Sequence, residues 1–154
     1  MIRPATPADA PALAALYNPF VQHTTITFEE EPVSDAEMAR RITEVAGTLP
    51  WLLEEVDGQL LGYAYASPWK ARSAYRCTAE TTVYVSPDAA RRGVGGRLYR
   101  RLLEELKRRG FHSAIGLIAL PNDPSIALHE KLGFVKVAHL HEVGLKFGRW
   151  IDVG

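Results

Sequence analysis

Residues 91–96 read Arg-Arg-Gly-Val-Gly-Gly and lie between a β-branched segment ending at Val85 and a long amphipathic helix pattern. Glycines let the backbone approach a ligand closely. The unpaired amides at a helix start, together with the helix dipole, favour a phosphate or pyrophosphate. Arg91 and Arg92 add two cations at the same place. The pattern therefore predicts a site for a phosphate-bearing ligand.

Two other phosphate-binding motifs do not fit this segment. It lacks the Gly-Lys-Ser/Thr ending of a Walker loop. It also lacks the full G-x-G-x-x-G of a dinucleotide-binding fold, because Arg97 and Leu98 follow Gly95 and Gly96. A glycine-bearing turn with solvated arginines remains as the alternative.

Glu80 lies within Ala-Glu-Thr-Thr-Val-Tyr-Val, a strand pattern in which Glu80, Thr82 and Tyr84 share one face. A carboxylate at this place is costly to bury without a purpose or a partner. Glu80 is a candidate general base, a role that rests mostly on the family resemblance described below. The alternative is a surface glutamate, or one that is paired with Arg72 or Arg76.

Asn122, Ser125 and His129 form a second group of polar residues, where a strand pattern gives way to a helix pattern. Ser125 and His129 are four residues apart and share one face of the helix. The ordinary pKa of histidine lies near physiological pH, which suits His129 to donate a proton. Asn122 follows a strand pattern and precedes the helix cap, a place where its side chain can bond a ligand. The alternatives are a turn residue for Asn122 and a helix-surface histidine beside Glu130.

The remaining metal-binding residue types predict no metal site. His23, His112, His139 and His141 show no metal spacing with a cysteine or with a carboxylate helix motif. Cys77 has no activating partner in the sequence and is interpreted as a buried small residue. As the only cysteine, it excludes an intramolecular disulfide and fits a reducing cytosol.

The chain has 154 residues, which predicts one domain, residues 1–154, with a sizeable core. The 18 Lys and Arg residues balance 18 Asp and Glu residues, so no net basic field favours nucleic acid or an anionic membrane. The N-terminus lacks the basic start and apolar run of a signal peptide. No stretch approaches the ~20 apolar residues of a membrane span. We therefore expect a cytoplasmic enzyme or binding domain.

Apolar periodicity, caps and turn signals predict a mixed α/β fold in the order β-α-α-β-β-β-α-β-α-β-β. Asp57-Gly58 predicts a hairpin turn, and Asp123-Pro124 predicts a helix N-cap followed by proline. Residues 23–28 are expected to be extended. The predicted helices cover residues 7–21, 35–46, 96–109 and 123–132, and the predicted strands cover residues 1–2, 51–56, 60–67, 78–85, 113–120, 134–141 and 142–146.

The strand–turn–helix unit around residues 90–95 resembles motif A of the GNAT superfamily of N-acetyltransferases, whose loop pattern is Q/R-x-x-G-x-G/A; Ala90 departs from the first position. Four longer blocks resemble the phosphinothricin N-acetyltransferase group, which also contains enzymes acting on methionine sulfone and methionine sulfoximine. The likeness spans nearly the whole chain in the correct order. Ile151 departs from it, since relatives usually carry histidine there. The four blocks are residues 17–32, 68–87, 119–134 and 144–154.

The resemblance implies an α/β fold with a predominantly antiparallel central sheet, strands splayed at the coenzyme A site, and flanking helices. It implies acetyl-CoA as cosubstrate, a homodimer, and direct attack by the α-amine of a small amino-acid-like substrate. Glu80 would then act as general base, directly or through water. His129 occupies the position of a tyrosine that, in the wider superfamily, protonates the sulfur of coenzyme A.

The residue patterns and the resemblance together assign further binding residues. The expected cofactor-binding residues are Val83, Tyr84, Val85, Arg91, Arg92, Gly93, Val94, Gly95, Gly96, Asn122 and Ser125. The expected substrate-binding residues are Phe28, Glu29, Lys70, Arg72 and Tyr75. Among these, Arg72 could hold a carboxylate or phosphinate in bidentate fashion.

Two other functions stay open. A non-catalytic acyl-CoA-binding or regulatory module would keep the glycine-rich turn without productive chemistry. An acetyltransferase of protein N-termini or lysines would need an open groove in place of the closed pocket suggested by the aromatic residues Phe28, Trp69 and Tyr75.

Overall fold

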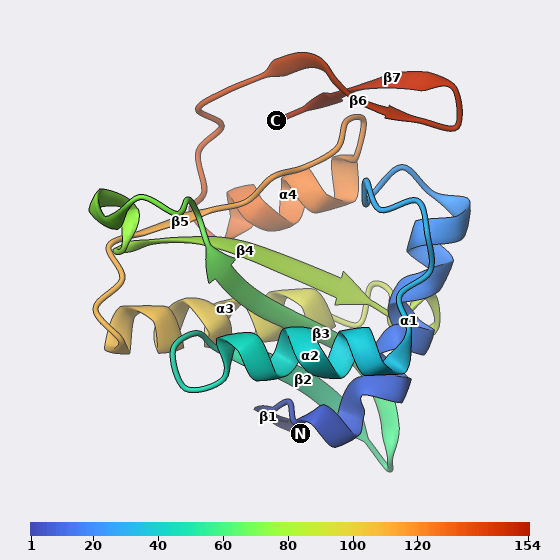
Figure 1. Ribbon diagram of the computed structural model, residues 1–154, viewed down its shortest axis with the longest axis vertical. Coiled ribbons are helices and arrows are strands. Elements are labelled where there is room, and N and C mark those ends of the chain that lie inside the picture. The colour runs from blue at the N-terminus through green and yellow to red at the C-terminus, as the bar shows by residue number, and fades with distance from the viewer.

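The computed structural model describes all of residues 1–154 and is built around a five-stranded sheet in the order β1-β2-β3-β4-β5 (Figure 1). The first four strands pair antiparallel, and β4 and β5 pair parallel. The predicted mixed α/β fold with a predominantly antiparallel sheet is therefore confirmed. The strands are β1 (Ile2–Pro4), β2 (Trp51–Val56), β3 (Gln59–Pro68), β4 (Thr78–Val85) and β5 (Ser113–Ile115).

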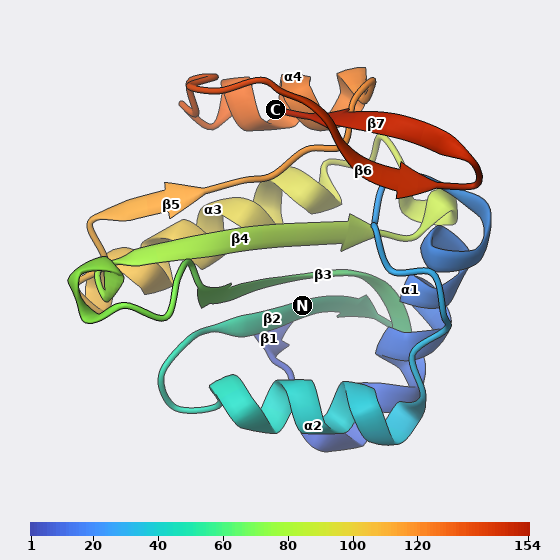
Figure 2. The same ribbon diagram turned by 45° about the horizontal axis from the view of Figure 1, so that its top comes forward.

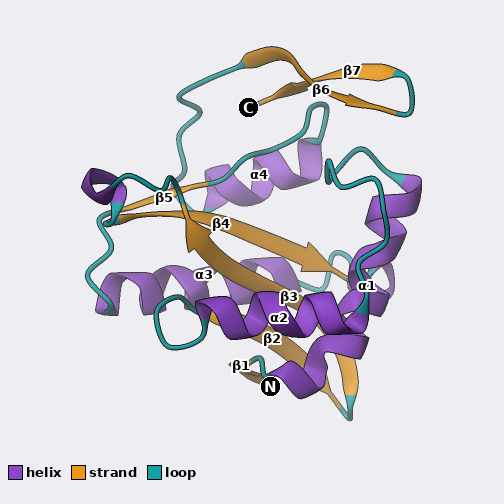
Figure 3. Ribbon diagram, in the orientation of Figure 1, coloured by secondary structure: helices purple, strands orange, loops and turns teal.

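Helices cover both faces of this sheet (Figure 3). Side chains alternate along β2, so Leu53 packs with α1 and α2 on one face, while Leu52 packs with α3 on the other. The hydroxyl of Ser34 caps α2 by accepting a hydrogen bond from the amide of Glu37 at 3.1 Å. The helices are α1 (Ala10–His23), α2 (Asp35–Val45), α3 (Val94–Arg108) and α4 (Asp123–Lys131), with three short 3-10 helices at Pro7–Asp9, Ser73–Tyr75 and Pro87–Ala89.

The segment that begins as β5 changes its partner part of the way along. Ser113–Ile115 pairs with the start of β4, after which the two strands separate (Figure 2). Ile118 then exchanges two backbone hydrogen bonds with Gly154, and the amide of Leu120 donates to the carbonyl of Asp152. The chain thus opens a wedge beside the second half of β4, the splay that the resemblance implied.

The far side of this wedge is an antiparallel hairpin of β6 (Leu140–Lys146) and β7 (Arg149–Val153). Phe147 and Gly148 form its turn, and both have positive φ. The sequence prediction of strands at 134–141 and 142–146 was wrong in position, because the turn falls after residue 146.

Three further local predictions differ from the structure. Residues 23–28 form no strand after the end of α1. Asn122, not Asp123, caps α4, since its side-chain oxygen accepts from the amide of Ser125 at 3.3 Å. Cys77 is exposed, not buried, because it ends the surface loop that precedes β4.

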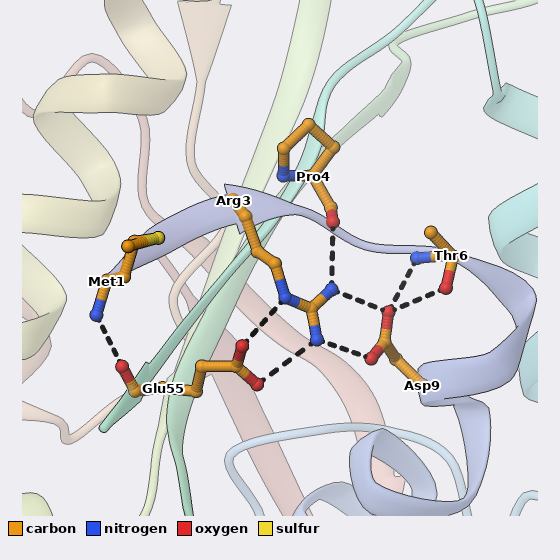
Figure 4. Close-up of polar contacts among 6 residues, drawn as sticks. All are labelled: Met1, Arg3, Pro4, Thr6, Asp9 and Glu55. Atoms are coloured by element: carbon orange, nitrogen blue, oxygen red, sulfur yellow. Dashed lines mark hydrogen bonds and ion pairs between the residues drawn. The ribbon is translucent and has the colours of Figure 1, made fainter. Parts of the chain in front are cut away.

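A charged network secures the N-terminal strand (Figure 4). The guanidinium of Arg3 donates to Asp9 at 2.7 Å and to Glu55 at 2.9 Å, and the terminal amine of Met1 donates to the carbonyl of Glu55. The Arg3 bonds lower the pKa of the Asp9 carboxyl well below its usual range. The network therefore ties β1 to the start of α1 and to β2. None of the helices has the length and apolar character needed to cross a membrane.

Candidate active site

The wedge between β4 and the segment after β5 holds a small cavity of about 50 Å³. Side chains of α4 and of the loop after α1 close its sides. The lining residues are Ile26, Thr81, Thr82, Val83, Tyr84, Leu117, Ile118, Ala119, Asn122, Ser125 and His129. Five predicted cofactor or catalytic residues, from two separate parts of the sequence, therefore meet here: Val83, Tyr84, Asn122, Ser125 and His129.

A larger cavity of about 320 Å³ lies elsewhere, between β1, the end of α2 and α3. It contains none of the predicted site residues. Two of its three arginines are already paired, Arg3 with Asp9 and Glu55, and Arg101 with Glu105 at 3.0 Å, and the third, Arg109, donates to the carbonyl of Gly47. The smaller cavity is the better candidate, because it brings polar groups together beside unpaired backbone.

The glycine-rich turn lies at the wide end of the wedge, just beyond β4. Gly93 adopts the left-handed conformation (φ 74°) and precedes α3, which begins at Val94. The first helical hydrogen bond runs from the amide of Arg97 to the carbonyl of Gly93 at 3.1 Å. The amides of Val94, Gly95 and Gly96 precede that bond, so they are free to donate to an anion.

Arg97 braces this turn, a role that the sequence analysis missed. Its guanidinium donates to the carbonyl of Arg92 at 2.8 Å and pairs with the buried carboxylate of Glu54 at 2.7 Å. Glu54 is one of two adjacent acids in β2, so the sequence gives no local sign that it pairs with Arg97. Arg91 and Arg92 stay exposed with no acidic partner, which leaves two cations for an anionic ligand.

Glu80 is a half-buried carboxylate with no hydrogen bond or ion pair. It lies on β4 between Ser67 of β3 and Ile115 of β5. Burial raises the pKa of its carboxyl above the ordinary value, and the nearby ammonium of Lys70 opposes the shift. A carboxylate with a raised pKa and a free lone pair is suited to accept a proton near neutral pH.

The structural alternative for Glu80, pairing with Arg72 or Arg76, does not occur. Arg72 lies over the ring of Tyr75, 5.6 Å from its centroid. Arg76 donates instead to the carbonyl of Ser73. Of the predicted substrate residues in this loop, only Lys70 affects the pKa of the Glu80 carboxyl, which its ammonium lowers.

His129 is buried and its two ring nitrogens are both bonded. Nδ1 lies 2.7 Å from the carbonyl of Ser125, so it carries the proton and donates. Nε2 then accepts from the hydroxyl of Tyr99 at 3.0 Å, and Tyr99 lies 2.6 Å from the hydroxyl of Thr81. Burial lowers the pKa of His129, and burial also raises the pKa of Tyr99 to about 12. The result is a neutral histidine at the end of a hydrogen-bonded chain that begins on β4.

Gly116 makes room for this arrangement. A Cβ on Gly116 would lie 2.6 Å from Nε2 of His129 and 3.4 Å from the hydroxyl of Tyr99. Tyr99 and Thr81 were not among the predicted site residues. Both residues fit the ordinary apolar and polar patterns of α3 and β4, so the local sequence gives no sign that they join a hydrogen-bonded chain from β4 through α3 to α4.

The predicted substrate residues Phe28 and Glu29 lie in the loop between α1 and α2. This loop packs against β6. The ring of Phe28 lies against Gly144, leaving no space for a Cβ there. The buried ammonium of Lys146 donates to the carbonyl of Thr27 at 2.8 Å. One oxygen of Glu29 pairs with Arg41 at 2.7 Å, and the other is buried without a partner. The loop thus carries an aromatic wall and a carboxylate oxygen that is buried with no hydrogen-bond partner.

The chain was compared with known proteins. Residues 2–153 match the family model described as an acetyltransferase (GNAT) domain. The chain is 44% identical over 153 residues to the phosphinothricin N-acetyltransferase of Streptomyces viridochromogenes, covering 99% of this chain and 84% of that protein. It is 37% identical over 153 residues to the L-methionine sulfoximine/L-methionine sulfone acetyltransferase of Salmonella typhimurium, covering 99% and 90%.

The fold is similar to that of a solved relative. The crystal structure of a GNAT superfamily phosphinothricin acetyltransferase from Sinorhizobium meliloti, in complex with acetyl-CoA, superposes with a TM-score of 0.95 at 36% identity, covering 99% of this chain and 84% of that one. The family match spans nearly every residue, the splayed strands and the glycine-rich turn included. The chain therefore belongs to the GNAT family of N-acetyltransferases.

Proposed function

We propose that this chain transfers the acetyl group of acetyl-CoA to the α-amine of a small amino acid with a tetrahedral, oxygen-bearing tail. Phosphinothricin, methionine sulfone and methionine sulfoximine have this form, and the names of the relatives support the substrate class. The observation that carries the proposal is Glu80, an unpaired, half-buried carboxylate on the strand that leads into the glycine-rich turn.

Binding of the cosubstrate is assigned to the turn and the wedge. The free amides at residues 94–96 would hold the diphosphate, with Arg91 and Arg92 adding charge. The edge of β4 from Val83 to Val85 has no strand partner on the wedge side, so its backbone can pair with the pantetheine amides. An amide there would also stabilise the negative charge that develops on the thioester oxygen. The amide nitrogen of Asn122 has no partner in the chain and can contact the cofactor.

The chemical step needs a neutral amine and a proton for the leaving thiolate. A free α-amine titrates near ~8, so Glu80 removes its proton either directly or through a water molecule. His129 is proposed to protonate the sulfur. In that step the Nδ1–H bond, now directed at the carbonyl of Ser125, breaks as the S–H bond forms. The imidazole then regains a proton from solvent, and Glu80 releases the amine proton to solvent, once the products have left. The reaction uses no metal in this proposal.

The substrate is expected to lie between Glu80 and the loop that carries Phe28 and Glu29. The unpaired oxygen of Glu29 can accept from an ammonium or amine. Lys70 and Arg72 supply cations for the carboxylate or the oxygen-bearing tail, and Tyr75 lies beside Arg72.

We also propose that the chain works as a single domain, in the cytoplasm, as a homodimer. The dimer is supported by the large apolar side chains that are exposed on and next to the β6–β7 hairpin. Single apolar residues scattered over a surface are ordinary, but several on one segment indicate an interaction site. The exposed side chains include Val135, Val137, Val143, Leu145, Phe147 and Trp150, which are 54–89% exposed.

A thiol-release assay tests the proposed activity. Purified protein with acetyl-CoA is offered phosphinothricin, methionine sulfone, methionine sulfoximine, the ordinary amino acids and a peptide with a free N-terminus. We expect release with the first three compounds. Calorimetric binding of coenzyme A with no release on any amine would favour a binding module, and release on the peptide alone would favour a protein acetyltransferase.

Gly144→Ala is expected to raise the KM for the amine by about tenfold, with the KM for acetyl-CoA unchanged. The new methyl group must displace the Phe28 ring, and with it the loop that holds Glu29; a loop shift of this size costs about 1–2 kcal/mol. Steady-state kinetics with each substrate varied separately measures both constants.

The control for this prediction is a double-mutant cycle with Phe28→Ala. If the ring is the element displaced, Gly144→Ala adds little once the ring is gone, so the two effects are not additive. Additive effects, or an equal rise in the KM for acetyl-CoA, would show that Gly144 acts through the hairpin as a whole.

A further inference from the structure

Two histidines and an aspartate meet at the base of the β6–β7 hairpin, outside the cavity described above. His139 precedes β6, His141 lies in β6 and Asp152 lies in β7. One ligand atom from each side chain lies within 4.8 Å of the other two. Oδ2 of Asp152 is 2.7 Å from Nε2 of His139 and 3.2 Å from Nδ1 of His141. Both imidazoles therefore converge on one carboxylate oxygen.

The backbone holds this cluster in position. The regular pairing of β6 with β7 is interrupted between Leu140 and Gly144, where Glu142 has positive φ. The amide of Glu142 donates to Oδ1 of Asp152 at 2.8 Å, which fixes the carboxylate and leaves Oδ2 for the histidines. The two rings stack with centroids 4.4 Å apart. The side chains are thus arranged by the irregular strand and by each other.

We propose that His139, His141 and Asp152 form a binding site for a divalent transition metal ion such as Zn²⁺, with water completing the coordination. Imidazole nitrogen and carboxylate oxygen are usual ligands of zinc. Ligand atoms around tetrahedral zinc lie ~3.3 Å apart, given bonds of about 2.0–2.1 Å. The 3.2 Å separation of Asp152 Oδ2 from His141 already lies near this value, whereas the 2.7 Å separation from His139 must lengthen. The three ligand atoms lie within 4.8 Å of one another, so rotation of the exposed histidine side chains brings them to the distances that the ion requires.

Lys136 is the group that opposes metal binding. Its ammonium lies 3.2 Å from Nδ1 of His139 and can only donate, so the ring proton of His139 lies on Nε2, facing Asp152. A metal ion at Nε2 replaces that proton and needs the other nitrogen protonated, which requires the exposed Lys136 side chain to move away. The site should therefore bind metal more tightly without this lysine.

Isothermal titration of tag-free, chelator-treated protein with Zn²⁺ tests the site. We expect one ion per chain, and Co²⁺ should give the visible absorption of a low-symmetry nitrogen and oxygen site. His139→Ala, His141→Ala and Asp152→Asn should each weaken Zn²⁺ binding by at least ~10-fold, because even loss of an outer partner of a metal ligand costs 10–100-fold. Lys136→Gln should tighten it.

His112→Ala is the matched control, since His112 is an exposed histidine outside the cluster. It should bind Zn²⁺ as the unsubstituted protein does. The proposal fails if no saturable uptake occurs, if half an ion binds per chain, or if His112→Ala weakens binding as much as His139→Ala does. Acetyl transfer by His139→Ala measures the activity separately, so loss of the metal site leaves the proposed function standing.

Discussion

Replacing Glu80 with glutamine is expected to lower kcat by about 10²–10⁴-fold, the usual contribution of a positioned general base. The amide has the shape of the carboxylate but cannot take up a proton at neutral pH. Glu80 lies on the strand face away from Tyr99 and makes no bond within the chain, so its loss should leave the fold and coenzyme A binding intact. Steady-state kinetics and calorimetric coenzyme A binding measure the two effects.

The pH dependence gives an independent test of the same residue. Burial raises the pKa of Glu80, and its carboxylate is the active form, so kcat should fall as the pH drops through that raised pKa. In Glu80→Gln this acid limb disappears. Lys70→Met removes the charge that lowers the pKa of Glu80, so the limb should move to higher pH.

Glu104→Gln is the control for the Glu80 variant. Glu104 is exposed on α3 and pairs with no cation, so the substitution should change neither kcat nor its pH dependence. A Glu80→Gln variant with full kcat at neutral pH would remove Glu80 from the reaction. An unchanged acid limb would assign that limb to another group.

The sequence predicted the order of elements because most boundaries carry local signals. Asp57 and Gly58 both have positive φ, and this pair marked the β2–β3 turn. The β6–β7 turn uses the same positive φ values at Phe147 and Gly148, but phenylalanine is a rare residue there, so the strands were misplaced. The sequence identifies a turn only where the residues at the turn are of types that commonly adopt the backbone conformation the turn requires.

Residues 113–120 show what local patterns cannot supply. The apolar run predicted one strand buried on both faces, whereas the structure pairs residues 113–115 with β4 and then transfers the chain to β7. Which strand a segment pairs with depends on residues far away in the sequence, so a change of partner does not alter the local pattern of apolar residues. The resemblance implied the splay, and the residues alone did not.

The residues of the candidate site also fall into those that the sequence could identify and those that it could not. The glycine-rich turn and Glu80 could be found from the sequence, because each combines unusual residue types with a strand or helix boundary. The contacts of Tyr99, Arg97 and Lys146 could not, because each side chain bonds a partner 18 or more positions away, apart from the local bond of Arg97 to Arg92. Such pairings follow from the packing of the elements.

Gly93→Val is expected to weaken acetyl-CoA binding by roughly 100-fold. The left-handed conformation at Gly93 turns the backbone so that the following amides point out of the start of α3. A β-branched residue is strained there, and its Cβ would lie 3.2 Å from the guanidinium of Arg97. Loss of one or two charge-assisted hydrogen bonds, at about 1.5–3 kcal/mol each, accounts for the expected change.

Gly110→Val separates this effect from simple destabilisation. Gly110 follows α3 with a similar φ of 82°, and no atom lies within 4 Å of a Cβ there. Both valines should therefore lower the melting temperature by a similar few degrees, through ~1–2 kcal/mol of backbone strain. Only Gly93→Val should also weaken coenzyme A binding by calorimetry. Equal affinities for the two variants would mean that the diphosphate is held elsewhere, and the proposed placement of the thioester beside Glu80 would fail with it.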